Sequence, residues 1–404
     1  NYFYPDLPTG YQISQFYHPI VTKGYIDIDL EDGISKRINI TRLHMEQDAG
    51  KSIHDLSASE SFIDLNRAGI ALMEIVSEPE IHTAKEAMAY VKKMRSILRY
   101  LGTCDGNMDE GSFRVDVNIS LHKPGTPFGD RAEIKNINSI KFVGQAIEYE
   151  IARQLEIIED GGKIVQETRL FDPTKGETRT MRSKENAHDY RYFPDPDLKP
   201  LILSDARIAG IKAQMVELPD AKKKRFMEEL SLSAYDAEVL VVEKETADFY
   251  ESILAASQSA DKKQAAKQIA NWLISEVFGA MNRSGIQALS DLPFKPAYLA
   301  YLVDNITNNT ISGKIAKDVF AKMWESGEDP NTIIAQQGLK QVLDPQAIEN
   351  AVTKILAQSQ DQVAQYKAGK ETLFGFFVGQ IMKEMKGKAN PAMVNDLLKK
   401  ALSE

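Results

Sequence analysis

Hydrophobic and polar positions alternate along much of the first half of the chain, and this alternation predicts β-strands. Residues 25–30 read Tyr-Ile-Asp-Ile-Asp-Leu, Asp32-Gly33 is typical of a hairpin turn, and residues 36–41 follow as the partner strand. The first half is therefore expected to contain a mixed, largely antiparallel sheet.

Two segments of the first half have helical spacing instead. One starts at Thr83, where Glu86 completes a capping box, and ends at Gly102. Its apolar positions recur every three or four residues, as on one face of a helix. The second runs from about residue 142 to 159 and ends at Gly161-Gly162.

Helix-length segments rich in Ala, Lys, Glu and Leu replace the strand pattern after about residue 216. We expect three domains: a mixed domain at 1–215, a helical domain at 216–332 and a small helical tail domain at 333–404. The fold class expected is α+β, with the sheet-containing domain followed by two all-α domains.

Charged side chains line one face of two predicted strands, because residues two apart in a strand share a face. The first face carries Arg42, His44, Glu46 and Asp48, and a Gly50-Lys51 turn is expected at its end. The second carries Arg114, Asp116, Asn118 and Ser120, opposite a face of apolar residues. Such a density of charge costs stability unless it holds an ion or a charged ligand. Both faces are candidate walls of an active site.

Glu74 is a third candidate, in a run of apolar residues that reads as a buried strand. A lone buried Glu is more often neutralised by a neighbouring Arg or Lys than bound to a metal. With three acidic segments in one domain, however, Glu46, Glu74 and Asp116 could converge on Mg²⁺, which takes one or two carboxylates plus phosphate and water. The basic residues that could meet a nucleotide or an acyl phosphate are Lys51, Arg67, Arg114 and Lys135.

Composition excludes several classes of protein. The 404 residues are 43% hydrophobic and 26% charged, with no signal-peptide pattern and no apolar run of roughly 18 residues. The single cysteine, Cys104, rules out an intrachain disulfide and suits a reducing cytosol. There is no Walker loop and no dinucleotide glycine fingerprint. The net charge of −9 gives no overall attraction to nucleic acid, so any such contact must be local.

Two segments offer such local contacts. Residues 189–197 interleave aromatic residues, an arginine and acids in a proline-bounded loop, which suits either the gripping of RNA or simple anchoring of the loop. From Tyr366 to Glu404, seven lysines stand against four acidic residues, an excess of +3. In the same tail, Gly375 and Gly379 suit close helix packing or a close approach to RNA.

A series of strings along the whole chain closely resembles the B subunit of the bacterial aspartyl/glutamyl-tRNA amidotransferases. The strings are residues 2–6, 11–15, 43–51, 64–79, 110–120, 135–139, 189–196, 375–383 and 387–391. Any one string would be weak evidence of kinship, but this many in one order is highly specific.

The resemblance implies an ATP- and Mg²⁺-dependent ligase. ATP would phosphorylate the side-chain carboxylate of Glu or Asp on a mischarged tRNA. Ammonia released from glutamine by a partner amidase, the A subunit, would then displace phosphate. A small third partner, the C subunit, would complete a cytoplasmic heterotrimer. The N-terminal domain would be a cradle-shaped synthetase domain, and the helical tail would bind the tRNA.

The resemblance also implies roles for individual residues. Glu46 and Glu74 match metal-binding carboxylates, and Asp116, His44, Asp48, Lys51 and Arg114 are further candidates as ligands, orienting groups or phosphate contacts. The tRNA contacts would be Tyr190, Arg191, Lys383, Lys386 and Lys388. Members of the family carry a further N-terminal segment with an acid and a histidine that complete the metal site. The chain is therefore expected to be an N-terminally truncated member.

Two alternative functions stay open. A non-catalytic tRNA-binding or scaffold protein of the same fold would use the tail and leave Glu46 and Glu74 idle. A stand-alone Mg²⁺-dependent ATP ligase would act on a small free carboxylate. The sequence does not distinguish a preference for Glu-tRNA(Gln) from one for Asp-tRNA(Asn).

Overall fold

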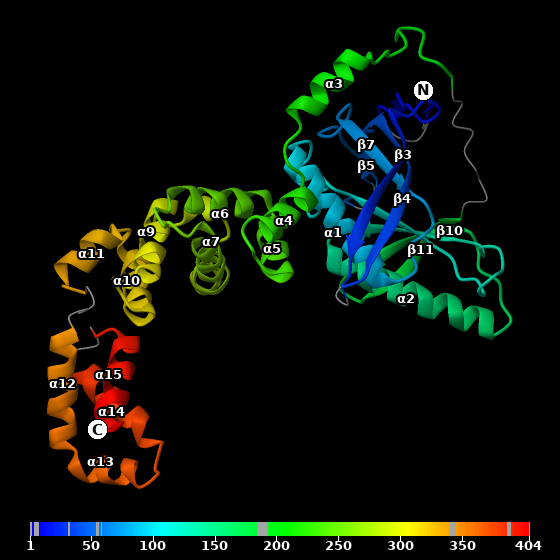
Figure 1. The fold of residues 1–404 in the computed structure, drawn as a ribbon. Helices are drawn as coiled ribbons and strands as arrows, with labels where there is room; N and C mark the ends of the chain where they lie inside the picture. The colour runs from blue at the N-terminus through cyan, green and yellow to red at the C-terminus, as the bar shows by residue number, and fades with distance from the viewer. Residues whose placement is uncertain are drawn as a thin grey trace. The chain divides into compact units, whose positions relative to one another are not determined.

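The computed structural model describes the chain except for residues 1, 4–7, 31–32, 54–55, 58, 184–192, 340–344, 386–388 and 404. The chain divides into two compact units, Asn1–Leu218 and Pro219–Glu404, and each is described by itself. Figure 1 shows sheets and helices in the first unit and helices in the second. No helix within the described residues is both long enough and apolar enough to span a bilayer.

A three-stranded antiparallel sheet carries the first polar face. Its strands are β3 (Val21–Asp29), β4 (Ser35–Gln47) and β7 (Ala71–Ser77), with β4 in the middle. The predicted hairpin is confirmed, since Ile26 pairs with Ile38 and Asp29 with Ser35. The neighbouring strands β4 and β7 change register between Ile40 and Arg42.

A four-stranded sheet carries the second polar face. Its order is β11 (Glu177–Ser183), β10 (Glu167–Asp172), β9 (Ala132–Ile137) and β8 (Val115–Ile119). The β9–β10 pair is parallel and the other two pairs are antiparallel. Two short sheets join β1 (Tyr2–Phe3) to β2 (Tyr11–Gln12) and β5 (Lys51–Ile53) to β6 (Phe62–Asp64). The expectation of mixed, largely antiparallel sheet is confirmed.

Helices α1 (Ala84–Leu101) and α2 (Ile140–Glu159) lie close to the predicted positions. The Thr83 hydroxyl accepts a hydrogen bond from the backbone N–H of Glu86, and Gly102 ends α1 in the left-handed conformation, with φ of 69°. The second helix starts at Ile140, slightly earlier than expected, because the Ser139 hydroxyl caps it by accepting from the backbone N–H of Phe142.

Helix α1 packs against both of the larger sheets. Met94 and Leu98 join a core cluster with Ile28 and Ile38 of the three-stranded sheet. Val91 joins a second cluster with Ile134 and Phe171 of the four-stranded sheet and with Val143 of α2. The shared helix holds the two polar-faced strands in one unit. Helix α3 (Asp205–Gln214) ends the unit and buries none of its residues.

The second unit consists of helices with two separate hydrophobic clusters. The first cluster draws on α4 (Pro219–Glu228), α5 (Ala234–Val241), α6 (Lys244–Ala256), α7 (Lys262–Asn271), a π-helical turn (Trp272–Val277), α8 (Phe278–Ser284), α9 (Pro296–Thr307), α10 (Gly313–Ser326) and α11 (Pro330–Gln336). A 3-10 turn (Leu289–Asp291) lies before α9. The second cluster draws on α12 (Pro345–Gln358), α13 (Gln360–Lys367), α14 (Leu373–Glu384) and α15 (Pro391–Ser403).

The α+β fold class is therefore confirmed. The three-domain division stays a prediction, and its last boundary falls inside α11. Ile333 and Ile334 of that helix pack into the first cluster of the second unit, so by its contacts the helix belongs with the preceding helices.

Candidate metal and phosphate site

Three potential metal ligands meet on adjacent strands of the three-stranded sheet. His44 of β4 is the cross-strand partner of Glu74 of β7, and Glu46 lies two residues further along β4 on the same face. One ligand atom from each of the three side chains lies within 4.8 Å of the other two. The Nε2 atom of His44 is 3.0 Å from Glu46 Oε1 and 3.8 Å from Glu74 Oε2.

The three groups differ in exposure. His44 is fully buried, Glu46 is largely buried, and about half of the Glu74 side chain is exposed (50%). The expectation that Glu74 is buried is therefore wrong: the strand faces core on one side only, and Glu74 lies on the other. Partial desolvation and the nearby Glu46 carboxylate still raise the pKa of Glu74, against the opposing charges of His44 and Arg42.

This arrangement fits a divalent cation. Two carboxylates in a partly dry setting disfavour each other's ionised state, and a cation between them would relieve that repulsion. Carboxylate oxygens are the ligands that Mg²⁺ prefers. The buried Nδ1 of His44 has no hydrogen-bond partner among the described residues, so no protein contact sets the imidazole tautomer from that side.

Asp116, predicted as a third carboxylate ligand, is not in this group of three. Its carboxylate is 2.7 Å from Lys135 Nζ, and Lys135 is also 3.5 Å from Glu133 Oε1. Burial alone would lower the pKa of Lys135, but the charges of Asp116 and Glu133 raise it above its ordinary value. The charge of Asp116 also contributes to the raised pKa of Glu74, so Asp116 lies within electrostatic range of that carboxylate.

Asp48 brings two of the predicted phosphate contacts together. Arg67 Nε lies 2.9 Å from Asp48 Oδ2, and an amino group of Arg114 bonds the same oxygen. Two guanidinium groups around one carboxylate leave a net positive charge, which suits a phosphate. Arg67 and Arg114 are 38% and 52% exposed at the side chain, so solvent and ligand can reach them.

The expected Gly50-Lys51 turn does not form: Gly50 is not in a turn, and Lys51 begins β5. Lys51 is exposed and pairs across the strands with Asp64, and its role as a phosphate contact stays a prediction. A Cβ atom at Gly50 would lie 2.7 Å from the Pro8 carbonyl oxygen and 2.8 Å from the Leu65 side chain. Glycine is needed at this position for close approach of the chain.

Sequence reasoning missed Ser14 and Phe16, two residues that contact the ligand group. Ser14 Oγ lies 3.1 Å from Glu46 Oε1, and the Phe16 ring meets His44 edge-on at 5.9 Å. The Arg42 guanidinium lies over that ring, 4.6 Å from its centre. Residues 11–15 stood out only as one of the family strings, and nothing in their composition signals a charged site.

The predicted tRNA contacts are only partly visible. Tyr190, Arg191, Lys386 and Lys388 lie outside the described residues. Lys383 is exposed near the end of α14. On the same helix, Cβ atoms added at Gly375 or Gly379 would meet nothing within 4 Å. Within the described structure, these glycines therefore do not serve close helix packing.

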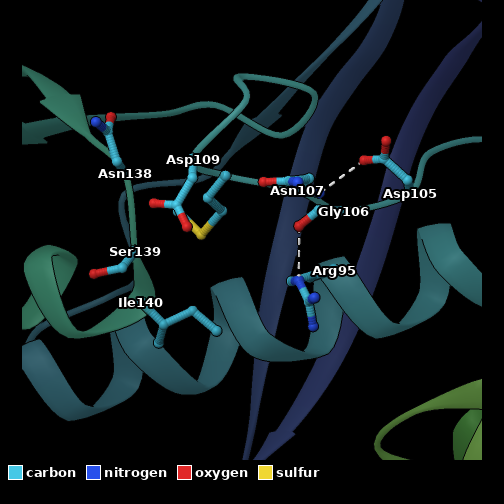
Figure 2. Close-up of a pocket in the computed structure, with 9 residues that line it drawn as sticks. Arg95, Asp105, Gly106, Asn107, Asp109, Asn138, Ser139 and Ile140 are labelled. Atoms are coloured by element: carbon cyan, nitrogen blue, oxygen red, sulfur yellow. Dashed lines mark hydrogen bonds between the residues drawn. The ribbon is translucent and has the colours of Figure 1, made fainter. Parts of the chain in front are cut away.

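A pocket of about 530 Å³ lies elsewhere in the first unit, between α1, the loop at 105–109 and the start of α2. Figure 2 shows Arg95 on one side, bonded to the Gly106 carbonyl oxygen at 2.8 Å, and Ser139 and Ile140 on another. Asn138 and Ser139 belong to a family string, but the Ser139 hydroxyl is used in capping α2. None of the predicted site residues lines this pocket.

Comparison with known proteins identifies the class of protein to which this chain belongs. Residues 1–209 match the GatB/GatE catalytic domain, and residues 248–402 match the GatB domain. The first match spans more than half of the chain, so its first unit is a catalytic domain of the GatB/GatE type.

Individual relatives narrow the class. The B subunits of the aspartyl/glutamyl-tRNA(Asn/Gln) amidotransferases from Granulibacter bethesdensis and Nitrobacter winogradskyi are 56% and 57% identical to this chain over 402 residues. These alignments cover all of this chain and 82% and 81% of the relatives. The chain belongs to the family of these B subunits.

Proposed function

We propose that this chain is the ATP-dependent subunit of a tRNA-dependent amidotransferase that acts on Glu-tRNA(Gln), Asp-tRNA(Asn) or both. The observation that carries the proposal is the meeting of His44, Glu46 and Glu74 in a chain of this family. ATP and Mg²⁺ are the cofactors, an amidase and a small third protein are the partners, and the cytoplasm is the site of action.

The reaction needs two displacements. An oxygen of the aminoacyl side-chain carboxylate attacks the terminal phosphorus of ATP, and ADP leaves. Ammonia then attacks the carbonyl carbon of the acyl phosphate. Phosphate leaves, and the side chain becomes an amide. Mg²⁺ would supply neutralisation of the charge on the transferring phosphoryl group. No side chain of the chain needs to act as a nucleophile.

The residues divide between two tasks. Glu46 and Glu74, with His44 beside them, would hold the divalent cation. Arg67 and Arg114, oriented by Asp48, would bind phosphate oxygens with charge-assisted hydrogen bonds. Lys135, kept protonated by Asp116 and Glu133, would add a positive charge beside them. This pairing of acids with an array of basic groups is what transfer of a phosphoryl group to a carboxylate requires.

The tRNA would contact the tail. Lys383, Gly375, Gly379 and Phe376 are all exposed along α14. A lysine offers a phosphate contact, an aromatic ring offers a stacking surface, and bare glycines let a backbone approach closely. Tyr190, Arg191, Lys386 and Lys388 stay predicted contacts.

The deciding experiment is amidation by the reconstituted complex. The chain is combined with its amidase partner and the small third protein, and amidated tRNA and ADP are measured with glutamine, ATP, Mg²⁺ and each mischarged tRNA. We expect both products with the wild-type chain and a loss of at least a hundredfold with Glu46→Ala. Glu229 is an exposed acidic residue immediately after α4, and Glu229→Ala is the matched control.

The two rival functions give different results. If Glu46→Ala amidates as fast as wild type, the catalytic proposal fails. The function of the chain would then be tRNA binding alone. ATP turnover on free glutamate without any tRNA would instead support a stand-alone ligase.

A further inference from the structure

A short segment before the hairpin completes the sheet beside the candidate metal ligands. The pairing of β3 with β4 reaches Leu43 and stops there. Beyond that point, the N–H of Gln47 donates to the Ile13 carbonyl (3.2 Å) and the N–H of Gln15 donates to the Met45 carbonyl (2.9 Å). Ser14 forms an antiparallel bridge with Glu46 at this place. The backbone of residues 13–15 thus takes over the edge of β4 that β3 leaves.

This pairing sets the Ser14 hydroxyl against the Glu46 carboxylate. Ser14 Oγ lies 3.1 Å from Glu46 Oε1, the same oxygen that His44 Nε2 approaches to 3.0 Å. The backbone N–H of Phe16 donates to Ser14 Oγ at 3.2 Å. Because this bond uses a lone pair of the hydroxyl oxygen, the hydroxyl proton is left to point at Glu46.

We propose that Ser14 is a positioning residue for the metal ligand Glu46, an inference that rests on the proposed function. Its hydrogen bond and that of His44 converge on one oxygen and fix the rotation of the carboxylate. A ligand held in this way does not need to be ordered when the cation binds. Ser14 itself contacts neither cation nor substrate.

The test uses Mn²⁺ as a paramagnetic probe on the full chain. Binding is measured by isothermal titration, and the ligand field of bound Mn²⁺ is followed by electron paramagnetic resonance. We expect Ser14→Ala to weaken Mn²⁺ binding about tenfold, as is typical when a hydrogen-bond partner of a ligand is removed. Ser14→Thr keeps the hydroxyl on a β-branched residue suited to a strand, and should bind Mn²⁺ within about twofold of wild type.

Two controls separate this inference from the proposed function. Glu46→Ala should abolish Mn²⁺ binding, whereas Ser252→Ala, which removes only a hydroxyl bonded to the helix backbone of the second unit, should leave it unchanged. If Glu46→Ala abolishes binding but Ser14→Ala matches wild type, the positioning role is overturned and the metal site stands. If the wild-type chain and Glu46→Ala bind Mn²⁺ alike, or neither binds, both ideas fail.

Thermal unfolding tests whether Ser14 affects Mn²⁺ binding only through the stability of the fold. Ser14→Ala and Ser14→Thr should unfold at similar temperatures while differing in Mn²⁺ affinity and in the resonance spectrum. Equal losses of affinity in both variants would contradict a role for the hydroxyl.

Discussion

Glu74 is the side chain at which folding and ligand binding make opposite demands. Its carboxylate is partly desolvated and lies near Glu46, and both effects raise its pKa. A group whose ionised form is disfavoured in the fold reduces stability at neutral pH. Functional sites commonly contain such groups, because a bound ion later compensates the repulsion.

Glu74→Gln should therefore stabilise the free chain while removing a metal ligand. The ordinary pKa of the Glu74 carboxyl is 4.5, and its pKa in the folded state is higher. Between these two pH values, Glu74 binds more of its proton in the folded state than in the unfolded state. Stability then falls as pH rises through this interval and stays lower above it. We expect the variant to melt about 1–2 °C higher than wild type at pH 7.5, a small gain because half of the side chain is solvated.

The gain should shrink as pH falls below 4.5 and should be nearly gone at about pH 3.5, where Glu74 is largely protonated in both states. Melting temperatures by circular dichroism, measured without divalent ions from pH 3.5 to 8, check both points. A variant that is less stable than wild type at neutral pH would show that Glu74 has a structural role instead.

The sequence predicted the first polar face because strand periodicity is local information. His44 and Glu46 are two residues apart, so they share a face in any straight strand. Local periodicity does not predict which residue pairs with His44 across the sheet. Glu74 lies opposite His44 because β4 and β7 shift register between Ile40 and Arg42, and no local pattern announces that irregularity.

At the scale of elements, caps were the most readable signals and buried polar contacts the least. Thr83, Glu86 and Gly102 bounded α1 correctly because each acts on its own backbone or within one turn. A buried ion cluster between α2 and the strands β10 and β11 was not predicted. Its partners are far apart in the chain, and Glu150 looks in sequence like any polar residue of a helix.

Glu150 is the centre of this cluster. Its buried carboxylate accepts hydrogen bonds from Arg153 Nε (3.0 Å), Gln154 Nε2 (2.9 Å) and the Thr178 hydroxyl (3.1 Å), and Arg169 Nε lies 3.4 Å away. Burial by itself would raise the pKa of Glu150. The hydrogen bonds from Arg153 and Gln154 and the charges of both arginines outweigh burial and hold the pKa below its usual value.

Glu150→Gln should destabilise the first unit by about 2 kcal/mol at pH 7, because it removes the anion that Arg153 and Arg169 share, while Arg169 keeps its contact with Glu167. Since the pKa of Glu150 is lowered, its contribution is complete above pH 4.5 and is lost as pH falls through the folded-state pKa. The difference in urea midpoint between wild type and variant should therefore shrink in acid. Glu148→Gln, exposed on the same helix, is the control and should change little; an equal loss in both variants would refute the cluster's role.

At the scale of the whole molecule, the described hydrophobic clusters do not cross from one unit to the other. Two of them lie within Asn1–Leu218, and the other two lie within Pro219–Glu404. The candidate site draws only on the first unit, whereas the exposed face of α14 belongs to the second. Separate cores let the parts of the chain unfold separately.

Leu273→Ala tests this independence. Leu273 is fully buried in the largest cluster of the second unit, and its truncation should cost about 2–5 kcal/mol through lost burial and a residual cavity. If the cores unfold separately, calorimetry will show that only the transition of the core that contains Leu273 moves to lower temperature. Mn²⁺ affinity is a property of the first unit and should stay that of wild type. Leu292 is only partly buried at the edge of the same cluster, so Leu292→Ala should cause a smaller shift of the same transition. A single transition that moves as a whole would mean that the two units stabilise each other, and substitutions in the helical unit would then weaken the metal site as well.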